Sequence, residues 1–216
     1  VLDKVSRQEK EHTAALIISP TRELALQIDN AFQGFSYFTS ASSIAVYGGG
    51  DGQTFEREKR ALTEGASVII ATPGRLISHL NLGYVKFDKL DFLVLDEADK
   101  MLDMGFYDDI LKIIRFVPAS RQNLLFSATM PPKIRELARK IMNDPAEVNI
   151  ALSKPAAGVT QGAYVVYETQ KPELLKQLLN SRTDPSMLVF ASTKQTVKDL
   201  ERELKRAPTC WDPFDC

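Results

Sequence analysis

The stretch Phe92-Leu93-Val94-Leu95-Asp96-Glu97 places four apolar residues directly before two acids. An apolar run of this length without alternation is typical of a strand that is buried on both faces. The two acids then follow the carboxyl end of the strand, where open α/β sheets bind ligands. A carboxylate there can support Mg²⁺ in phosphoryl transfer while its neighbour activates the attacking water. A solvated acidic turn is the alternative interpretation.

Similar apolar runs occur on both sides of this stretch. They predict further strands at residues 14–18, 43–47, 68–71, 123–126 and 147–150. Helical patterns lie between them, for example at residues 23–35 and 107–116. Strands that alternate with helices favour an α/β fold with a mostly parallel, doubly wound sheet. We therefore predict one such domain over residues 1–150.

The pattern changes after residue 150. Residues 151–160 contain the stretch Lys-Pro-Ala-Ala-Gly and show no apolar periodicity, which predicts an interdomain linker. Strands are expected again at residues 163–167 and 187–191, and helices at 171–179 and 196–204. We predict that residues 161–206 form the start of a second domain, and residues 207–216 fit no element.

The composition excludes several classes of protein. With 44% hydrophobic and 25% charged residues, the 216-residue chain is typical of a globular protein. No apolar run approaches the ~20 residues of a membrane span, and no signal-peptide pattern opens the chain. Cys210 and Cys216 make neither a disulfide framework nor a zinc site. We expect a cytoplasmic protein whose natural beginning lies upstream of Val1.

Two similar segments, Ser19-Pro20-Thr21-Arg22 and Thr72-Pro73-Gly74-Arg75, follow predicted strands. Each offers a Ser or Thr as N-cap, a proline at the first helical position and an arginine in the first turn. The helix dipole disfavours a cation there, so two matching arginines predict a shared anion such as a phosphate chain. Solvated surface arginines are the alternative. Because the net charge is only −1, such binding must depend on local geometry.

Other candidate residues give weaker signals. The segment Gly48-Gly49-Gly50 follows a predicted strand and would let a ligand approach the backbone closely. The three aromatic residues Phe35, Tyr37 and Phe38 are expected in core or helix-end packing rather than in base stacking. Neither His12 nor His79 has a metal partner at ligand spacing, and both are expected on the surface.

Asp96-Glu97 continues as Ala98-Asp99, and this tetrapeptide with its flank to Phe106 resembles the signature of the DEAD-box ATP-dependent RNA helicases. Other motifs of that family have counterparts in the right order. They are Ser19 to Ala25 for motif Ia, Gly48-Gly49 for the glycine doublet, Thr72 to Arg75 for motif Ib, Ser127-Ala128-Thr129 for motif III, and Val189 to Thr193 for the start of motif IV. The resemblance covers about residues 14–206. It implies a RecA-like helicase lobe and the start of a second one, with ATP, Mg²⁺ and RNA as ligands.

The resemblance also implies roles for matching residues. Asp96 would hold Mg²⁺ through water, and Glu97 would position and activate the hydrolytic water. Asp99 would bond to Ser127 and Thr129, and the segment with Ala128 would couple ATP to RNA. Simple capping of the helix after Pro131 is the alternative for these two hydroxyls. RNA would be bound through its backbone, without sequence specificity, by Pro20, Thr21, Arg22, Gly48, Gly49, Thr72, Pro73, Gly74 and Arg75.

No Gly-x-x-x-x-Gly-Lys-Ser/Thr segment, which would hold the β- and γ-phosphates, occurs in the chain. In the family that loop would precede Val1, and motifs V and VI would follow Arg206. We therefore expect a catalytically incomplete part of an RNA-stimulated ATPase that unwinds short duplexes in bacterial RNA metabolism. A truncated lobe that binds RNA or a partner without hydrolysis is the first alternative. A DNA helicase is the second, and the Asp99 and Ser127-Ala128-Thr129 set argues against it.

Overall fold

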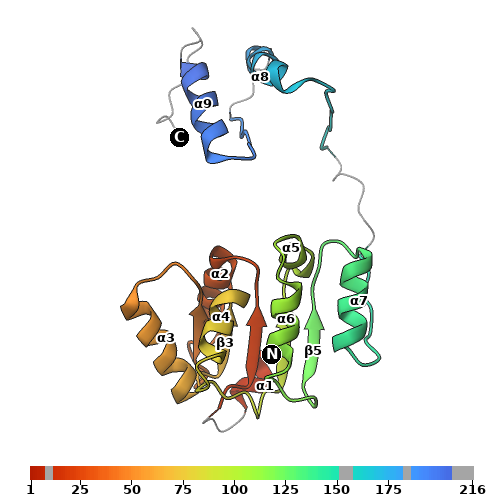
Figure 1. Ribbon diagram of the computed structural model, residues 1–216. Coiled ribbons are helices and arrows are strands. Elements are labelled where there is room, and N and C mark those ends of the chain that lie inside the picture. Colours follow the sequence, from red (N-terminus) through yellow and green to blue (C-terminus); the bar gives the residue numbers. More distant parts are fainter. Residues whose placement is uncertain (8–11, 151–157, 182–185, 206–216) are drawn as a thin grey trace. The chain divides into compact units, whose positions relative to one another are not determined.

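The computed structural model describes residues 1–7, 12–150, 158–181 and 186–205. The chain divides into two compact units, Val1–Glu147 and Val148–Cys216. Residues 151–157 of the predicted linker and the unassigned tail, residues 207–216, lie outside the described residues. The sheet belongs to the first unit (Figure 1).

Five strands form one sheet in which every neighbouring pair is parallel. They are β1 (Ala15–Ile18), β2 (Ser43–Val46), β3 (Val68–Ala71), β4 (Phe92–Leu95) and β5 (Gln122–Leu125), in the spatial order β2-β3-β1-β4-β5. The three central strands β3, β1 and β4 are buried at all four positions, which explains their uninterrupted apolar sequences. Each of these five predicted strands is confirmed to within one residue.

Helices cover both faces of the sheet (Figure 1). One face carries Ala15 and Ile17 of β1, and it packs against α1 (Leu2–Ser6) and α2 (Arg22–Phe35). The other face carries Leu16 and Ile18. Five helices pack on it, namely α3 (Gly52–Glu64), α4 (Pro73–Leu80), α5 (Ala98–Asp103), α6 (Tyr107–Ile114) and α7 (Pro132–Ile141). The predicted doubly wound α/β sheet is therefore confirmed.

Side-chain caps fix where α2 and α3 begin. Thr21 caps α2 by accepting a hydrogen bond from the Leu24 amide at 3.3 Å. Asp51 caps α3 in the same way, with 2.9 Å to the Thr54 amide. Gly65 ends α3 with a φ of 86°, a left-handed conformation that glycine adopts without steric cost. These caps set the length of the turns that join strands to helices at the edge of the sheet.

The second unit contains helices but no strand among its described residues. After the short 3₁₀ turn Glu168–Gln170, α8 spans Lys171–Asn180 and α9 spans Lys194–Lys205. Both predicted helices are confirmed. The prediction of strands at residues 147–150, 163–167 and 187–191 is wrong. A short apolar run becomes a strand only where a neighbour takes its backbone hydrogen bonds. Val148 and Ile150 are instead almost fully exposed, and no described helix is long and apolar enough to cross a membrane.

Candidate active site and nucleic-acid interface

All of the predicted site residues in the first unit follow the carboxyl ends of strands. Because the strands are parallel, these segments begin along the same edge of the sheet. Ser19 to Arg22 follow β1, Gly48-Gly49 follow β2, Thr72 to Arg75 follow β3, Asp96-Glu97 follow β4, and Ser127 to Thr129 come soon after β5. The structure therefore brings the acidic pair, the hydroxyl-bearing segment and both arginine segments to one edge.

Asp96 is a partly buried carboxylate. Its amide donates to the Ile18 carbonyl at 3.0 Å, and its Oδ1 accepts from the Glu97 amide at 3.0 Å. Burial raises the pKa of Asp96, the Glu97 amide opposes that shift, and the Glu97 carboxylate adds to it. No cation contacts Asp96 in the described ranges, and these contain no group of three or more metal-ligating side chains. One such carboxylate fits Mg²⁺, which takes its remaining oxygens from water and substrate phosphates.

Glu97 has a strained backbone. Its φ of 49° and ψ of 51° are left-handed, and in the described chain only Asp144 is another non-glycine residue with positive φ. A conformation of this kind costs about 1–2 kcal/mol and is found preferentially at functional sites. It turns the chain from β4 into α5 at the edge of the sheet. The Glu97 carboxylate contacts Lys100 at 2.9 Å in an exposed pair that contributes little to stability.

Asp99 joins α5 to the segment after β5. Its Oδ2 accepts from the Thr129 amide at 2.9 Å and from the Thr129 hydroxyl at 2.7 Å, and its amide donates to Ser127 Oγ at 3.2 Å. Partial burial alone would raise the pKa of Asp99. The hydrogen bonds from Thr129, Lys100 and Ser127 outweigh that effect, so the pKa lies below its ordinary value. Asp99 therefore stays ionised and holds this segment at the acidic strand end.

The capping interpretation of Ser127 and Thr129 is wrong. Helix α7 has Pro131 as its N-cap residue, and no side chain caps it. The Ser127 hydroxyl donates instead to the Thr129 carbonyl at 2.7 Å, which closes a tight turn around the exposed Ala128.

The two arginines do not occupy matching positions. In the first segment the N-cap is Thr21, so Pro20 precedes the helix and Arg22 is its first residue. In the second segment Thr72 is the N-cap and Pro73 is the first helical residue, so Arg75 is the third. The expectation of proline at the first helical position is wrong for α2, because the Thr21 hydroxyl is the one that reaches a free helix amide.

Arg22 is exposed and lies against the glycine doublet. Its guanidinium carbon is 4.7 Å from the centre of the Tyr47 ring. Gly49 has a φ of 87°, and a Cβ added there would lie 3.8 Å from Arg22 Nη1. Both Gly48 and Gly49 are exposed, as an approaching ligand requires.

The sequence predicted that Arg75 binds a phosphate, with a solvated position as the alternative, and that His79 lies on the surface. In the structure Arg75 is mostly buried, with its side chain 15% exposed, and His79 is fully buried. Both contact the carboxylate of Glu58 on α3, which compensates their burial. His12, in contrast, is only partly buried. Glu58 was missed in the sequence, although it lies on one helical face with Phe55 and Leu62, a spacing that predicts a buried position.

Phe35, Tyr37 and Phe38 are not in the core. They are 77%, 79% and 94% exposed, and the rings of Tyr37 and Phe38 contact each other edge to face. Phe35 ends α2, and Tyr37 and Phe38 come just after it. Because α2 begins at the carboxyl edge of the sheet, it ends away from that edge.

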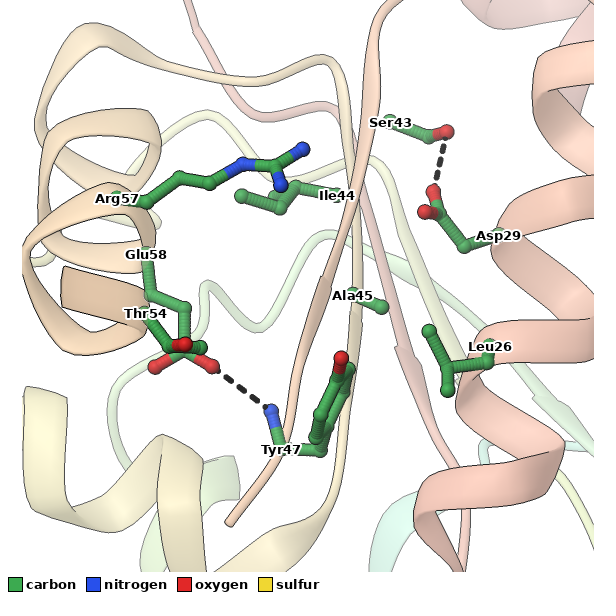
Figure 2. A pocket seen from close by; sticks show the side chains of 9 residues that line it. All are labelled: Leu26, Asp29, Ser43, Ile44, Ala45, Tyr47, Thr54, Arg57 and Glu58. Atoms are coloured by element: carbon green, nitrogen blue, oxygen red, sulfur yellow. Dashed lines mark hydrogen bonds between the residues drawn. The ribbon is translucent and has the colours of Figure 1, made fainter. Parts of the chain in front are cut away.

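A small cavity lies beside the edge strand β2, between α2 and α3 (Figure 2). Its volume is about 90 Å³, which suits a few water molecules and is well below the ~300 Å³ of a small-molecule site. It is lined by Leu26, Asp29, Ser43, Ile44, Ala45, Tyr47, Thr54, Arg57 and Glu58. It is therefore no nucleotide pocket, but it reaches the carboxylate of Glu58.

The model of the DEAD/DEAH box helicase family matches residues 1–137. An ATP-dependent RNA helicase CshA of Listeria monocytogenes is 41% identical over 198 residues, which are 91% of this chain and 38% of that protein. An ATP-dependent RNA helicase DeaD of Haemophilus influenzae is 37% identical over 95% of this chain and 33% of its own length. The RNA helicase CrhR of Synechocystis is 40% identical over 93% of this chain and 40% of its own length. The chain thus spans well under half the length of these relatives.

Asp96→Asn is expected to raise the melting temperature of the chain at neutral pH without Mg²⁺, by about 2 °C. The asparagine side chain can still accept a hydrogen bond from the Glu97 amide, and the substitution removes a partly buried charge. Because the folded-state pKa of Asp96 is raised, its ionised form lowers stability at neutral pH, and this loss disappears once the pH falls below the ordinary value.

Circular dichroism melts at neutral pH and at about pH 3.5 would measure this difference. Asp103→Asn, an exposed site at the end of α5, the helix that follows Asp96, is the matched control and is expected to change little. A gain that is equal at both pH values would contradict the assignment of Asp96 as a partly buried charge that no cation compensates in the described part of the chain.

Proposed function

This chain belongs to the DEAD/DEAH-box helicase family, and on that premise we propose that it is part of an ATP-dependent RNA helicase. In this role the carboxyl edge of the sheet handles ATP at β4 and binds RNA backbone at the ends of β1, β2 and β3. The observation that carries the proposal is the bonding of Asp99 to Ser127 and Thr129 next to Asp96 and Glu97. The names of the relatives supply the substrate class, RNA, and the cosubstrate, ATP.

The ATP side of the proposal rests on two carboxylates with different surroundings. Asp96 is the group that would hold Mg²⁺, whose bound charge would stabilise the phosphates during transfer. The Glu97 side chain is 41% exposed, and its ion pair with Lys100 exchanges easily with solvent. It would therefore orient and deprotonate the attacking water. The 216 residues contain no Gly-x-x-x-x-Gly-Lys-Ser/Thr segment, so ATP turnover is assigned to the whole protein and not to this chain by itself.

The RNA side rests on Arg22 and on the exposed backbone beside it. Arg22 is the first residue of α2, where free amides and the helix dipole favour an anion. Gly48 and Gly49 leave room for a phosphate chain next to its guanidinium. Thr72, Gly74 and Arg75 would extend this surface at the start of α4. Contacts of this kind are made to the backbone, so we expect binding of single strands or short duplexes without sequence preference. A cytoplasmic location remains part of the proposal.

Glu97→Gln in the protein that carries this chain is expected to lower RNA-stimulated ATP turnover by roughly 100-fold or more. ATP and RNA binding should persist, because the substitution keeps the shape of the side chain and leaves Asp96 unchanged. Phosphate release under saturating RNA would measure the loss. Glu136→Gln, an exposed glutamate on α7, is the matched control and should keep full turnover. Turnover at the unmodified rate in Glu97→Gln would remove Glu97 from the catalytic assignment.

Arg22→Ala is expected to weaken binding of single-stranded RNA to the chain by a similar factor for two unrelated sequences. The slope of log affinity against log salt should become shallower by roughly 0.7, the value for one lost phosphate contact on a single strand. Fluorescence anisotropy over a salt series would measure both quantities. Arg60→Ala, an exposed arginine at the far end of α3, serves as control. An unchanged slope, or a loss confined to one sequence, would show that Arg22 is an ordinary surface residue.

A further inference from the structure

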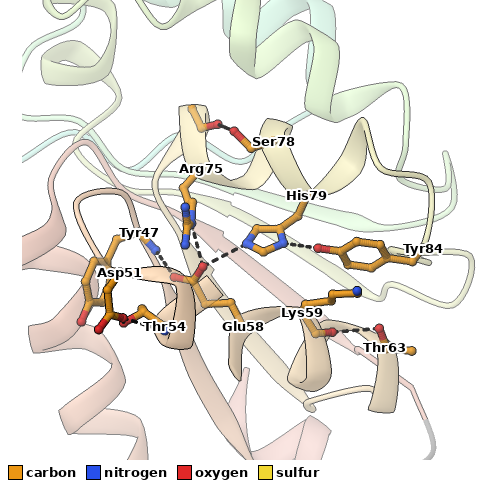
Figure 3. Close-up of polar contacts among 11 residues, drawn as sticks. Tyr47, Asp51, Thr54, Glu58, Lys59, Thr63, Arg75, Ser78, His79 and Tyr84 are labelled. Carbon is orange, nitrogen blue, oxygen red and sulfur yellow. Dashed lines mark hydrogen bonds and ion pairs between the residues drawn. The ribbon is translucent and has the colours of Figure 1, made fainter. Parts of the chain in front are cut away.

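A buried carboxylate lies at the centre of a polar network beneath the proposed RNA-binding edge (Figure 3). Glu58 lies on the side of α3 that faces α4, and its side chain is only 2% exposed. A carboxylate in such a place is unfavourable unless hydrogen bonds and a positive charge compensate it. The structure supplies both from two other segments of the chain.

Three donors reach this carboxylate. Its Oε1 accepts from the Tyr47 amide at 3.1 Å. Its Oε2 accepts from Arg75 Nε at 2.7 Å and from His79 Nε2 at 2.9 Å. The Arg75 guanidinium supplies a positive charge next to the carboxylate. Glu58 therefore connects the end of β2 to the first and second turns of α4.

The orientation of His79 follows from its neighbours. An ionised carboxylate can only accept, so Nε2 of His79 must carry a hydrogen. The other ring nitrogen, Nδ1, contacts the Tyr84 hydroxyl. Burial, together with the charges of Glu56 and Glu58, raises the pKa of Tyr84, so this hydroxyl stays protonated and available for the bond. The histidine is thereby fixed at both ends.

Two neighbours hold the Arg75 guanidinium, one along its edge and one against its face. The edge that carries Nε binds Glu58, and the guanidinium carbon lies 4.6 Å from the centre of the Phe55 ring. The same Phe55 ring stacks on His79 at 4.4 Å and 15°. Nη2 of Arg75 is buried and has no hydrogen-bond partner in the described part of the chain. The arginine is thus held in one orientation while part of its hydrogen-bonding capacity stays unused.

The network also reaches Arg22. Tyr47, whose amide binds Glu58, carries the ring on which Arg22 lies, and it directly precedes Gly48-Gly49. The contacts therefore run from Arg22 through Tyr47 and Glu58 to Arg75. We infer that Glu58 is a positioning residue of the RNA-binding edge, an inference that rests on the proposed RNA binding. Glu58 sets the spacing between Arg75 and the glycine doublet, so that both contact one RNA backbone.

Stability alone cannot test this role, because removing one member of a buried ion pair destabilises a protein whatever the pair does. RNA binding and its salt dependence can. Loss of fold lowers the fraction of competent chain but leaves the salt slope unchanged. Loss of a positioned phosphate contact makes the slope shallower.

The experiment compares four variants of the 216-residue chain: Glu58→Gln, Arg75→Ala, the double variant, and Glu64→Gln as control. Glu64 has the same charge, lies on the same helix and forms an exposed ion pair with Arg60. Binding of a labelled single-stranded oligouridylate is measured by anisotropy over a salt series, with melting curves to show that each variant is folded. Arg75→Ala is expected to weaken binding about tenfold and Glu58→Gln about three- to tenfold. Both should lower the salt slope by roughly 0.7.

The double variant should bind no more weakly than Arg75→Ala, because Glu58 acts through Arg75, and Glu64→Gln should bind as the unmodified chain. Additive losses, or an unchanged salt slope in Glu58→Gln, would overturn the inference and leave the proposed function standing. Unchanged binding in Arg75→Ala would instead remove Arg75 from the proposed function, and the inference with it. Should Glu58→Gln fail to fold, Glu58→Asp keeps the charge but shortens its reach, and the same non-additivity with Arg75→Ala is expected.

Discussion

The parallel pairing of the five strands is the constraint on which the rest of this structure depends. The central strands are in register, with Ile18 of β1 paired to Ala71 of β3 and to Leu95 of β4. Because these strands end at the same level, the segments that follow them begin side by side. The N-cap residues of α2 and α4, Thr21 and Thr72, and the acidic pair after β4 are therefore neighbours, although they lie more than twenty residues apart in the sequence. Short buried strands are sufficient to bring these segments together, and the candidate functional residues lie in the segments that follow the strands.

Two polar clusters then hold these turns by different physical means. The Asp99 cluster, formed by Asp99, Ser127 and Thr129, is only partly buried, so its hydrogen bonds can be exchanged for bonds to water at little cost. The Glu58 cluster is buried, and breaking it would leave a charge without a partner. The segment after β5 is accordingly suited to change its contacts when a ligand binds, whereas the end of β2 and the start of α4 are suited to stay in place.

The sequence predicts the parts of the fold that depend on local pattern. Val68–Ala71 and Phe92–Leu95 are unbroken apolar runs, and the predicted bounds of these two strands agree with the structure to the residue. The strands predicted at residues 163–167 and 187–191 are absent because a strand also needs a neighbour, which no local pattern reports. The burial of Arg75 and His79 was missed for a similar reason. Their compensating charge, Glu58, comes from another helix 17 and 21 residues away, and an arginine or histidine viewed alone is ordinarily a surface residue.

The central claim is that RNA meets the carboxyl edge of the sheet at residues 21–22, 48–49 and 72–75. A titration of the nitrogen-15-labelled chain with single-stranded RNA, followed by amide chemical shifts, tests it most directly. The account predicts that the amides of these three segments shift together at one affinity. The amides of Phe35, Tyr37 and Phe38, at the other end of α2, should stay unchanged. Shifts that gather at these aromatic residues and leave the three segments unperturbed would contradict the account.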